Sequence, residues 1–476
     1  MGLAQRRGRL TAGGPDTGRR EQNAGWAAPD LLLTFRSYDH GMSRRFHAPV
    51  VLPADPACSV LRSAVVDVTD DGRIGFVGPE ADAPEFAGEV TRLGGILLPG
   101  LVNTHAHSPM TLLRGMGGDL PLLRWLHEII WPAEAKLKPA DVRTGMLLGS
   151  VEMLRHGVTT SAEMYFEGEQ LVDAVLTTGG RTLVAPPVME LPGMDWRTTL
   201  QAIERWIDAD GLRFGPADRI ELGYGPHSAY MLNPDGLRAV AESAAARGAL
   251  VQIHVAEAAN EDLAQRERHG SVPKLLDEVG IFAGRTLAAH SIHLSDEDIA
   301  LFAARGVGMA HCPGSNAKLA SGIARVKELR AAGVAVGLGT DGPASNDDLD
   351  LWEEVQLSAM LARLATNDST VLTAADAFLL ATRGGAEALG RPDFGALEPG
   401  RWADLVHVDL DDPAFAAGLD VPDEQLLSNL VWAAGSRRVR DVWVGGERVV
   451  AAGESTRVDR AEVQASVADT AARLRA

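Results

Sequence analysis

The feature that most constrains the fold is a repeated alternation, between residues 96 and 343, of short β-type runs with amphipathic or Ala/Leu-rich helical stretches. This order is typical of βα units with a parallel sheet. Most runs begin with a nearly continuous apolar segment, as expected of strands buried on both faces, and end in polar residues or glycine. Eight strands are predicted, at residues 96–107, 159–166, 181–189, 220–228, 250–257, 286–294, 306–313 and 335–343.

Eight consecutive βα units predict an α/β fold, a (β/α)8 barrel of the TIM type. In such barrels the carboxyl ends of all strands meet at one face, where enzymes place their active sites. The chain has 476 residues, which leaves room for a barrel at 96–395 and a second, smaller domain.

Segments on both sides of the barrel predict a small β-sandwich. Residues 60–78 contain two strands around an Asp-Asp-Gly turn, and residues 440–450 contain two strands around a Gly-Gly turn. Residues 402–410 supply a further strand. We therefore expect segments 42–95 and 396–476 to combine into one small β-sandwich, with a helix at the carboxyl terminus.

The first 41 residues are expected to form a disordered extension. Residues 1–29 are rich in Arg, Gly and Ala and have no apolar periodicity. Nothing in the chain resembles a secretory signal or an apolar span of about 20 residues. Two cysteines cannot form a disulfide framework, so the sequence favours a cytoplasmic protein that does not enter the membrane.

Charge narrows the class of partner. The formal net charge of −19 would repel a phosphate backbone, and basic residues cluster only within the first twenty positions. We therefore expect no nucleic-acid partner and a small molecule as the ligand. The sequence is compatible with a homo-oligomer.

Histidine and aspartate residues stand at the ends of four predicted strands. His105 and His107 lie two residues apart at the end of the first strand, so both imidazoles face the same side. His254 ends the fifth strand, His290 the sixth and Asp341 the eighth. All five side chains are therefore expected at one rim of the barrel.

Four of these residues, His105, His107, His254 and Asp341, form a suitable ligand set for one divalent metal ion. Nitrogen and oxygen ligands favour zinc, although iron or manganese also fits. A position left open for water would let the ion lower the pKa of that water to about 7 and generate hydroxide.

Two residues are candidates for proton transfer. Glu257 follows His254 by three positions, just past the strand end, where its carboxylate suits general acid/base catalysis. His290 is interpreted as a hydrogen-bond partner of the hydroxide. A further metal ligand and a core histidine are the alternatives for His290.

Several motifs in order resemble the amidohydrolase superfamily, and more closely its methylthioadenosine/S-adenosylhomocysteine deaminase and chlorohydrolase branch. The resemblance spans about residues 60–450. It rests on LPGLVNTHAHSPMTLLRG at 98–115, GPHSAY at 225–230, HVAE at 254–257, AAHSIHL at 288–294, PGSNAKLASGIARV at 313–326, GTDGPASN at 339–346 and EPGRWADLV at 398–406.

The resemblance implies the same four metal ligands and catalytic roles for Glu257, His290 and Asp341, with Asp341 accepting a proton from the attacking water. It also implies that His227 faces the substrate. Relatives with two metals use a bridging modified lysine at a strand end. The five lysines here lie outside the predicted strands, which favours a single metal ion.

Two further substrate contacts are implied by the resemblance. Trp125 would help to cover the substrate, although its helical spacing with Leu122, Leu126 and Ile129 equally favours core packing. Arg181 would help to bind the nucleoside end of the substrate.

The sequence thus predicts a metal-dependent aminohydrolase that attacks an adenine-type nucleoside or related purine with a metal-bound hydroxide and releases ammonia. Triazine dechlorination or deamination, and deamination of guanine or a pterin, are the nearest alternatives, because all of them use the same hydroxide. A non-catalytic scaffold is the remote alternative.

Overall fold

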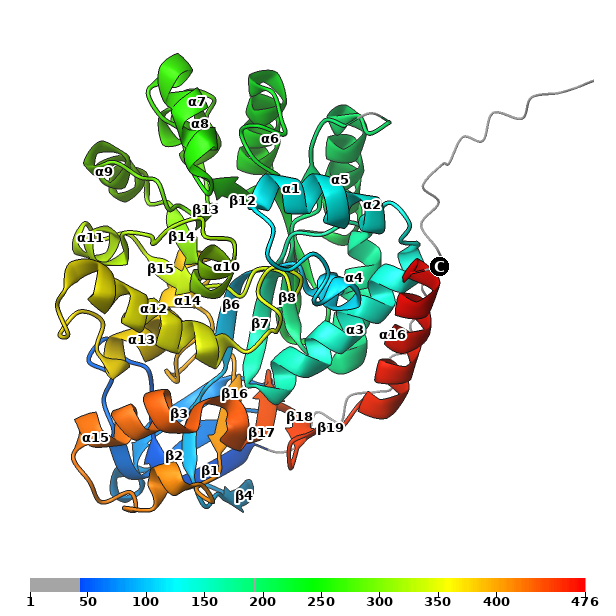
Figure 1. Cartoon of the computed structure of the whole chain (residues 1–476). Coiled ribbons are helices and arrows are strands. Elements are labelled where there is room, and N and C mark those ends of the chain that lie inside the picture. The colour runs from blue at the N-terminus through cyan, green and yellow to red at the C-terminus, as the bar shows by residue number, and fades with distance from the viewer. Residues whose placement is uncertain (1–42, 192, 476) are drawn as a thin grey trace, which may run out of the picture. The chain divides into compact units, whose positions relative to one another are not determined.

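A computed structural model describes residues 43–191 and 193–475 (Figure 1). The extension expected for residues 1–41 lies outside the described residues. Among those that are described, no helix combines the length and apolar character needed to cross a bilayer.

The barrel consists of parallel strands that follow one another around a closed ring (Figure 1). Each predicted strand is confirmed and is shorter than its predicted run, in most cases because the polar end belongs to a loop. Leu338 of the last strand pairs with Asn103 of the first and closes the ring. Within the described residues the barrel strands are β6 (Leu101–Ala106), β7 (Val158–Glu163), β8 (Arg181–Val184), β11 (Ile220–Pro226), β12 (Leu250–Val255), β13 (Thr286–His290), β14 (Gly308–His311) and β15 (Val336–Leu338).

Helices pack around the outside of these strands (Figure 1). They include α3 (Pro139–Arg155), α4 (Gly168–Thr178), α5 (Trp196–Asp210), α6 (Pro234–Arg247), α7 (Ala259–His269), α8 (Val272–Glu278), α9 (Asp296–Arg305), α10 (Pro313–Lys318), α11 (Val326–Ala331), α12 (Leu351–Thr366), α13 (Ala374–Leu380) and α14 (Arg383–Ala388).

Helix α5 shows how the sequence specifies these elements. The Asp195 side chain caps its amino end by accepting a hydrogen bond from the Arg197 backbone amide. Its buried residues are spaced three or four apart and form one apolar stripe toward the barrel. Gly211, with φ of 87°, ends the helix because glycine enters the left-handed region without a Cβ clash.

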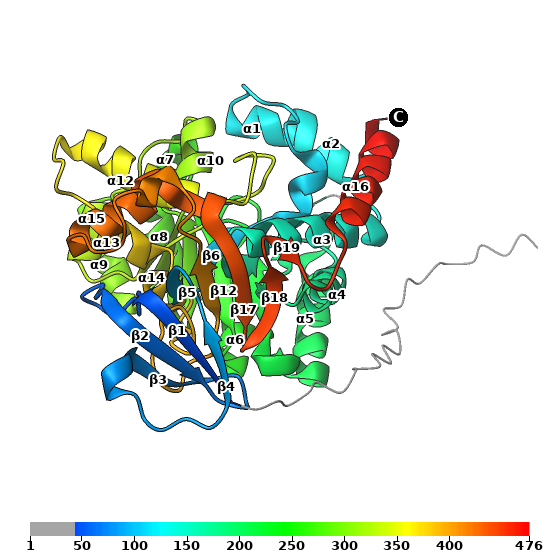
Figure 2. The same ribbon diagram turned by 90° about the horizontal axis from the view of Figure 1, so that it is seen from below.

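Amino- and carboxyl-terminal segments combine in a second sheet beside the barrel (Figure 2). Both predicted hairpins are confirmed, as β2–β3 and β17–β18. The terminal helix is α16 (Arg460–Arg475), and the short α15 spans Asp423–Ser428. Within the described residues the strands of this sheet are β1 (Arg44–Val51), β2 (Leu61–Val68), β3 (Ile74–Pro79), β4 (Glu89–Arg92), β5 (Ile96–Pro99), β16 (Leu405–Val408), β17 (Val439–Val444), β18 (Glu447–Ala451) and β19 (Glu454–Ser455).

The first predicted barrel strand began too early. Residues Ile96–Pro99 form β5, which pairs with β1 and β16 of the second sheet, and the barrel starts only at Leu101. Gly100 separates the two strands where the chain passes close to β7, because a Cβ there would lie 2.0 Å from Thr159 Oγ1. A single apolar run in the sequence therefore serves two different sheets.

Arg181 also differs from its expected role. It begins β8 at the end remote from the strand's carboxyl terminus, and its guanidinium forms two 3.1 Å hydrogen bonds with Asp404, just before β16. Both side chains are only 2% exposed. The guanidinium also donates to the backbone oxygens of Ala217 and Asp218. Arg181 therefore joins the barrel to the second sheet and does not line the pocket described below.

We expect Arg181→Met to lower the free energy of unfolding by about 3–5 kcal/mol, because it leaves Asp404 buried without its ion-pair partner. Chemical denaturation measures this loss. The KM of the folded fraction should stay unchanged, and a raised KM with normal stability would instead return Arg181 to substrate binding.

Candidate metal centre and active site

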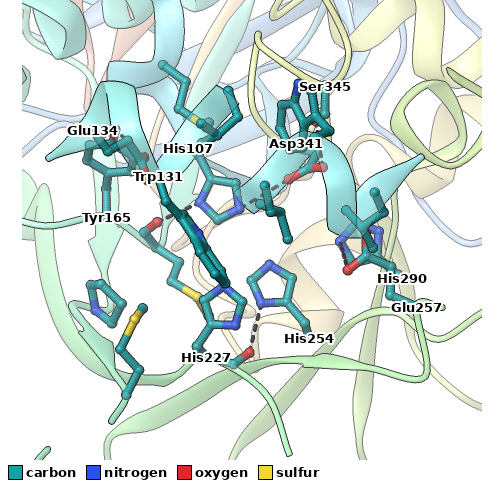
Figure 3. A pocket seen from close by; sticks show the side chains of 18 of the residues that line it. His107, Trp131, Glu134, Tyr165, His227, His254, Glu257, His290, Asp341 and Ser345 are labelled. Atoms are coloured by element: carbon teal, nitrogen blue, oxygen red, sulfur yellow. Dashed lines mark hydrogen bonds and ion pairs between the residues drawn. The ribbon is translucent and has the colours of Figure 1, made fainter. Parts of the chain in front are cut away.

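A pocket of about 780 Å³, including its mouth, opens at the carboxyl ends of the barrel strands (Figure 3). Its lining comes from two groups of segments. Those that follow β6, β7 and β8 are largely apolar and aromatic, whereas those at the ends of β11 to β15 supply most of the histidine and carboxylate groups.

Three histidines direct ring nitrogens toward one another. The ring nitrogens of His105, His107 and His254 lie within 4.8 Å of one another. His107 donates its Nδ1 proton to the backbone oxygen of Met164 at 2.6 Å, and His254 donates its Nδ1 proton to that of His227 at 2.8 Å. These bonds leave the Nε2 lone pairs of His107 and His254 free to bind a cation.

His105 is held by Gln252, two residues before His254 on the same face of β12. The Gln252 side-chain amide lies 2.6 Å from His105 Nδ1. The atom in that position is Gln252 Nε2, and the Gln252 carbonyl oxygen has no hydrogen-bond partner. When His105 binds a metal through Nε2, its Nδ1 carries the proton, and the Gln252 amide would turn to accept it through that oxygen. His105 Nε2 is then a fully buried nitrogen without a hydrogen-bond partner, as expected of a metal ligand.

Asp341 completes the cluster. Its Oδ1 lies 3.4 Å from His105 Nε2 and 3.1 Å from His107 Nε2. Ligand atoms that share one tetrahedral zinc with bonds of about 2.0 Å are separated by about 3.3 Å. Its Oδ2 accepts hydrogen bonds from the hydroxyls of Ser315 at 2.6 Å and Ser345 at 2.8 Å. The residues therefore fit one divalent metal ion, with Asp341 oriented so that one oxygen faces it.

The electrostatics of the cluster favour a bound positive charge. Burial, reinforced by neighbouring imidazoles, lowers the pKa of His227 to about 3 and holds that of His254 well below its usual value. Burial also lowers the pKa of His105, to about 4. Against the effect of burial, Asp341 raises the pKa of His107 to about 9. At neutral pH His105 and His254 are therefore uncharged ligands, and the positive charge that Asp341 favours on His107 shows that the site beside Asp341 attracts a cation.

Glu257 and His290 lie together beside this cluster. His290 Nε2 is 4.0 Å from the Glu257 carboxylate, and His290 Nδ1 donates to Asn316 Oδ1 at 2.9 Å. Burial raises the pKa of Glu257, which suits a carboxyl group that must both carry and release a proton. In Figure 3 the two side chains lie on one side of the pocket, next to Asp341.

Backbone strain coincides with these groups. Ala256, His290 and Asp341 have φ values of 46°, 63° and 61°, in the left-handed region that residues with a Cβ seldom adopt. Such strain is concentrated at functional sites, where the surrounding structure maintains it. Here it directs the chain away from each strand just where a functional side chain is needed.

Of the three residues expected to contact the substrate, two line the pocket and one does not. His227 lines the pocket, with its ring centre 4.6 Å from that of His254. Trp125 also lines the pocket, although it is 5% exposed and its Nε1 donates to the backbone oxygen of Met116. Trp125 therefore packs into the core and also reaches the pocket, whereas Arg181 is absent from the pocket lining.

Sequence reasoning assigned no role to several supporting residues. Ser315 and Asn316 belong to the PGSN motif and Ser345 to GTDGPASN, but neither motif reveals that these side chains reach Asp341 and His290. Glu163 ends β7 and accepts hydrogen bonds from the amide and hydroxyl of Ser108, directly after His107. A polar residue at a strand end is the one signal that could have singled it out.

Comparison with known proteins gives the family. Residues 96–449 match the amidohydrolase family. A 5-methylthioadenosine/S-adenosylhomocysteine deaminase from Pelotomaculum thermopropionicum is 40% identical, over 84% of this chain and 91% of that protein. A 5'-deoxyadenosine deaminase from Methanosarcina mazei is 40% identical, over 83% and 90%. The crystal structure of an adenosine deaminase from Xanthomonas campestris with bound zinc has a TM-score of 0.83 and 36% identity, and the match covers 91% of this chain and 98% of that one. The chain belongs to the amidohydrolase family.

Proposed function

We propose that this protein is a metal-dependent hydrolase that removes the amino group of an adenine-type nucleoside and releases ammonia. The observation that carries the proposal is the position of the Glu257 carboxyl group, buried beside His290 and next to a cluster that fits a metal ion. Two relatives of 40% identity are named as deaminases of 5-methylthioadenosine/S-adenosylhomocysteine and of 5'-deoxyadenosine.

Zinc is the metal that we propose, because three imidazole nitrogens and one carboxylate oxygen are typical zinc ligands and a similar structure contains zinc. A divalent ion held by His105, His107, His254 and Asp341 would lower the pKa of a water molecule and make it a nucleophile at neutral pH.

The protein side chains divide the proton transfers. Asp341 accepts one proton from the attacking water. His290, whose Nδ1 proton is donated to Asn316, uses its Nε2 lone pair to accept a hydrogen bond from that water and orient it. Glu257 donates its proton to the neighbouring ring nitrogen. The hydroxyl of the tetrahedral centre then gives its proton to the deprotonated Glu257, which passes it to the amino group. The carbon–nitrogen bond breaks as the new carbon–oxygen bond becomes a carbonyl, ammonia leaves, and the proton held by Asp341 returns to Glu257.

The opposite side of the pocket is suited to the sugar. Glu134 of α2 (Trp131–Glu134) accepts a hydrogen bond from the Tyr165 hydroxyl at 2.7 Å through Oε1. Its second carboxylate oxygen can accept hydrogen bonds from vicinal hydroxyls of a ribose. In Figure 3, Glu134 and Tyr165 lie across His107 from Glu257 and His290, so a nucleoside would span the two sides.

Glu257→Gln should retain its metal while turnover falls by about 10²-fold or more, because the amide cannot carry the proton. His254→Ala should lose both metal and activity, because a ligand is removed. Metal analysis and kcat on the same preparations separate the two effects. Loss of metal in Glu257→Gln would make Glu257 a ligand. Full activity with metal retained would move the proton carrier elsewhere, first to His290.

We expect about one divalent ion per chain, since no lysine lies on a barrel strand within the described residues to bridge a second. Elemental analysis of the purified protein, with zinc, iron and manganese counted separately, measures this ratio. Two ions bridged within the barrel would contradict the single-metal site.

The substrate class is tested by an ammonia-release screen over adenosine, 5'-modified adenosines, guanine, pterins and aminotriazines, with chloride release followed for chlorotriazines. The adenosines should give the highest kcat/KM. A higher kcat/KM for guanine, a pterin or a triazine would assign the same hydrolytic chemistry to another ring.

A further inference from the structure

The proposed catalytic groups line one side of the pocket, and largely apolar and aromatic residues line the other side. We call this region the apolar wall, and define it as the lining residues that follow β6, β7 and β8 outside the metal cluster. It includes Leu122, Leu126, Trp131, Phe166, Met189 and Leu191. Under the proposed function the amino-bearing carbon lies beside Glu257 and the ribose reaches Glu134, so the 5' end of the nucleoside is placed among the lining residues of this wall.

On this side of the pocket the described lining contains an acidic side chain and no basic one. No lysine or arginine is present among the described residues that line the pocket. Glu134 is the ionisable carboxyl group of the apolar wall. Arg124, on the neighbouring helix α1 (Leu122–Trp125), is exposed and engaged by Glu128 through two hydrogen bonds of 2.8 and 3.0 Å. The described lining of the pocket therefore offers no cation to a 5' substituent.

We infer, resting on the proposed function, that the substrate is an adenosine whose 5' substituent carries no negative charge, and that the apolar wall rejects anionic 5' groups, including the carboxylate of S-adenosylhomocysteine.

Two physical effects support this discrimination. An anion entering the pocket would lose hydration without gaining a partner, and it would lie on the same side as the Glu134 carboxylate. The ammonium of a zwitterionic tail can pair with Glu134, but its carboxylate remains without a cation. A deoxy or methylthio group has no such requirement, and the Met189 thioether and aromatic rings of the wall adapt to a small apolar substituent.

The test compares kcat/KM for a matched series of 5' substituents. The series contains 5'-deoxyadenosine, 5'-methylthioadenosine, the 5'-(2-aminoethylthio) and 5'-(2-carboxyethylthio) derivatives of 5'-deoxyadenosine, and S-adenosylhomocysteine. The two uncharged compounds should be best, and the cationic derivative should fall within about tenfold of them. The carboxyethyl derivative and S-adenosylhomocysteine should be lower by about 10²-fold, mainly through KM, because like charges and an unpaired anion oppose binding.

A gain-of-function pair tests the cause. Leu191 lines the pocket and is partly exposed, so an arginine there can direct its guanidinium into the pocket mouth. Leu191→Arg should raise the kcat/KM ratio of the carboxyethyl to the aminoethyl derivative at least tenfold, whereas the uncharged control Leu191→Gln should leave it within threefold. The ratio is taken within each variant, so a general loss of folded enzyme cancels.

The outcomes separate this inference from the proposed function. If the wild-type enzyme uses the carboxyethyl derivative within threefold of the aminoethyl one, the discrimination against anions is wrong while adenosine deamination stands. If no adenosine derivative releases ammonia, the proposed function itself fails. If Leu191→Arg and Leu191→Gln change the ratio equally, the lack of a cation is not the cause.

Discussion

The active centre depends on hydrogen bonds that decide which nitrogen of each histidine carries a proton. His107 and His254 donate their Nδ1 protons to the backbone oxygens of Met164 and His227, which belong to neighbouring strand ends. These acceptors are in place only when adjacent strands pair in the correct register. Closure of the barrel therefore fixes the tautomers, and the tautomers turn the Nε2 lone pairs toward one point.

Closure of the barrel also maintains an unfavourable backbone conformation at two residues of the site. A left-handed conformation at a residue with a Cβ costs about 1–3 kcal/mol, and it occurs at both His290 and Asp341. Hydrogen bonds across the strand ends offset this cost. The Asp341 amide donates to the His105 oxygen at 3.0 Å, and the Ser291 amide donates to the Val255 oxygen at 2.9 Å. The metal cluster and the strained turns are therefore consequences of one set of strand pairings.

Sequence periodicity predicted the strands and the polar residues at their ends, because both follow from local patterns. It did not predict side-chain contacts between residues that are far apart in the chain. Apolar runs revealed all eight barrel strands, and polar residues at their ends revealed the histidine and aspartate cluster. The run that contains β5 could not show that its first four residues join another sheet. Arg181 was misplaced because its partner, Asp404, lies 223 residues away in the chain. Likewise, nothing local indicates that Ser315 and Asn316 meet Asp341 and His290.

The proposed catalytic groups and the apolar wall come from different parts of the barrel, so one can change without the other. The proposed catalytic groups stand at or just after strand ends, where barrel pairing leaves little freedom of position. The apolar wall comes instead from segments after β6, β7 and β8, including a π-helical turn at Leu126–Ile130 between α1 and α2. Loop segments tolerate substitution better than strands do, since fewer strand pairings depend on them. Because the proposed attack on the ring is the same for every adenosine, the selectivity that we infer for the group at the 5' position is assigned to this wall. A change of charge there can alter the preferred substrate without disturbing any tautomer in the cluster.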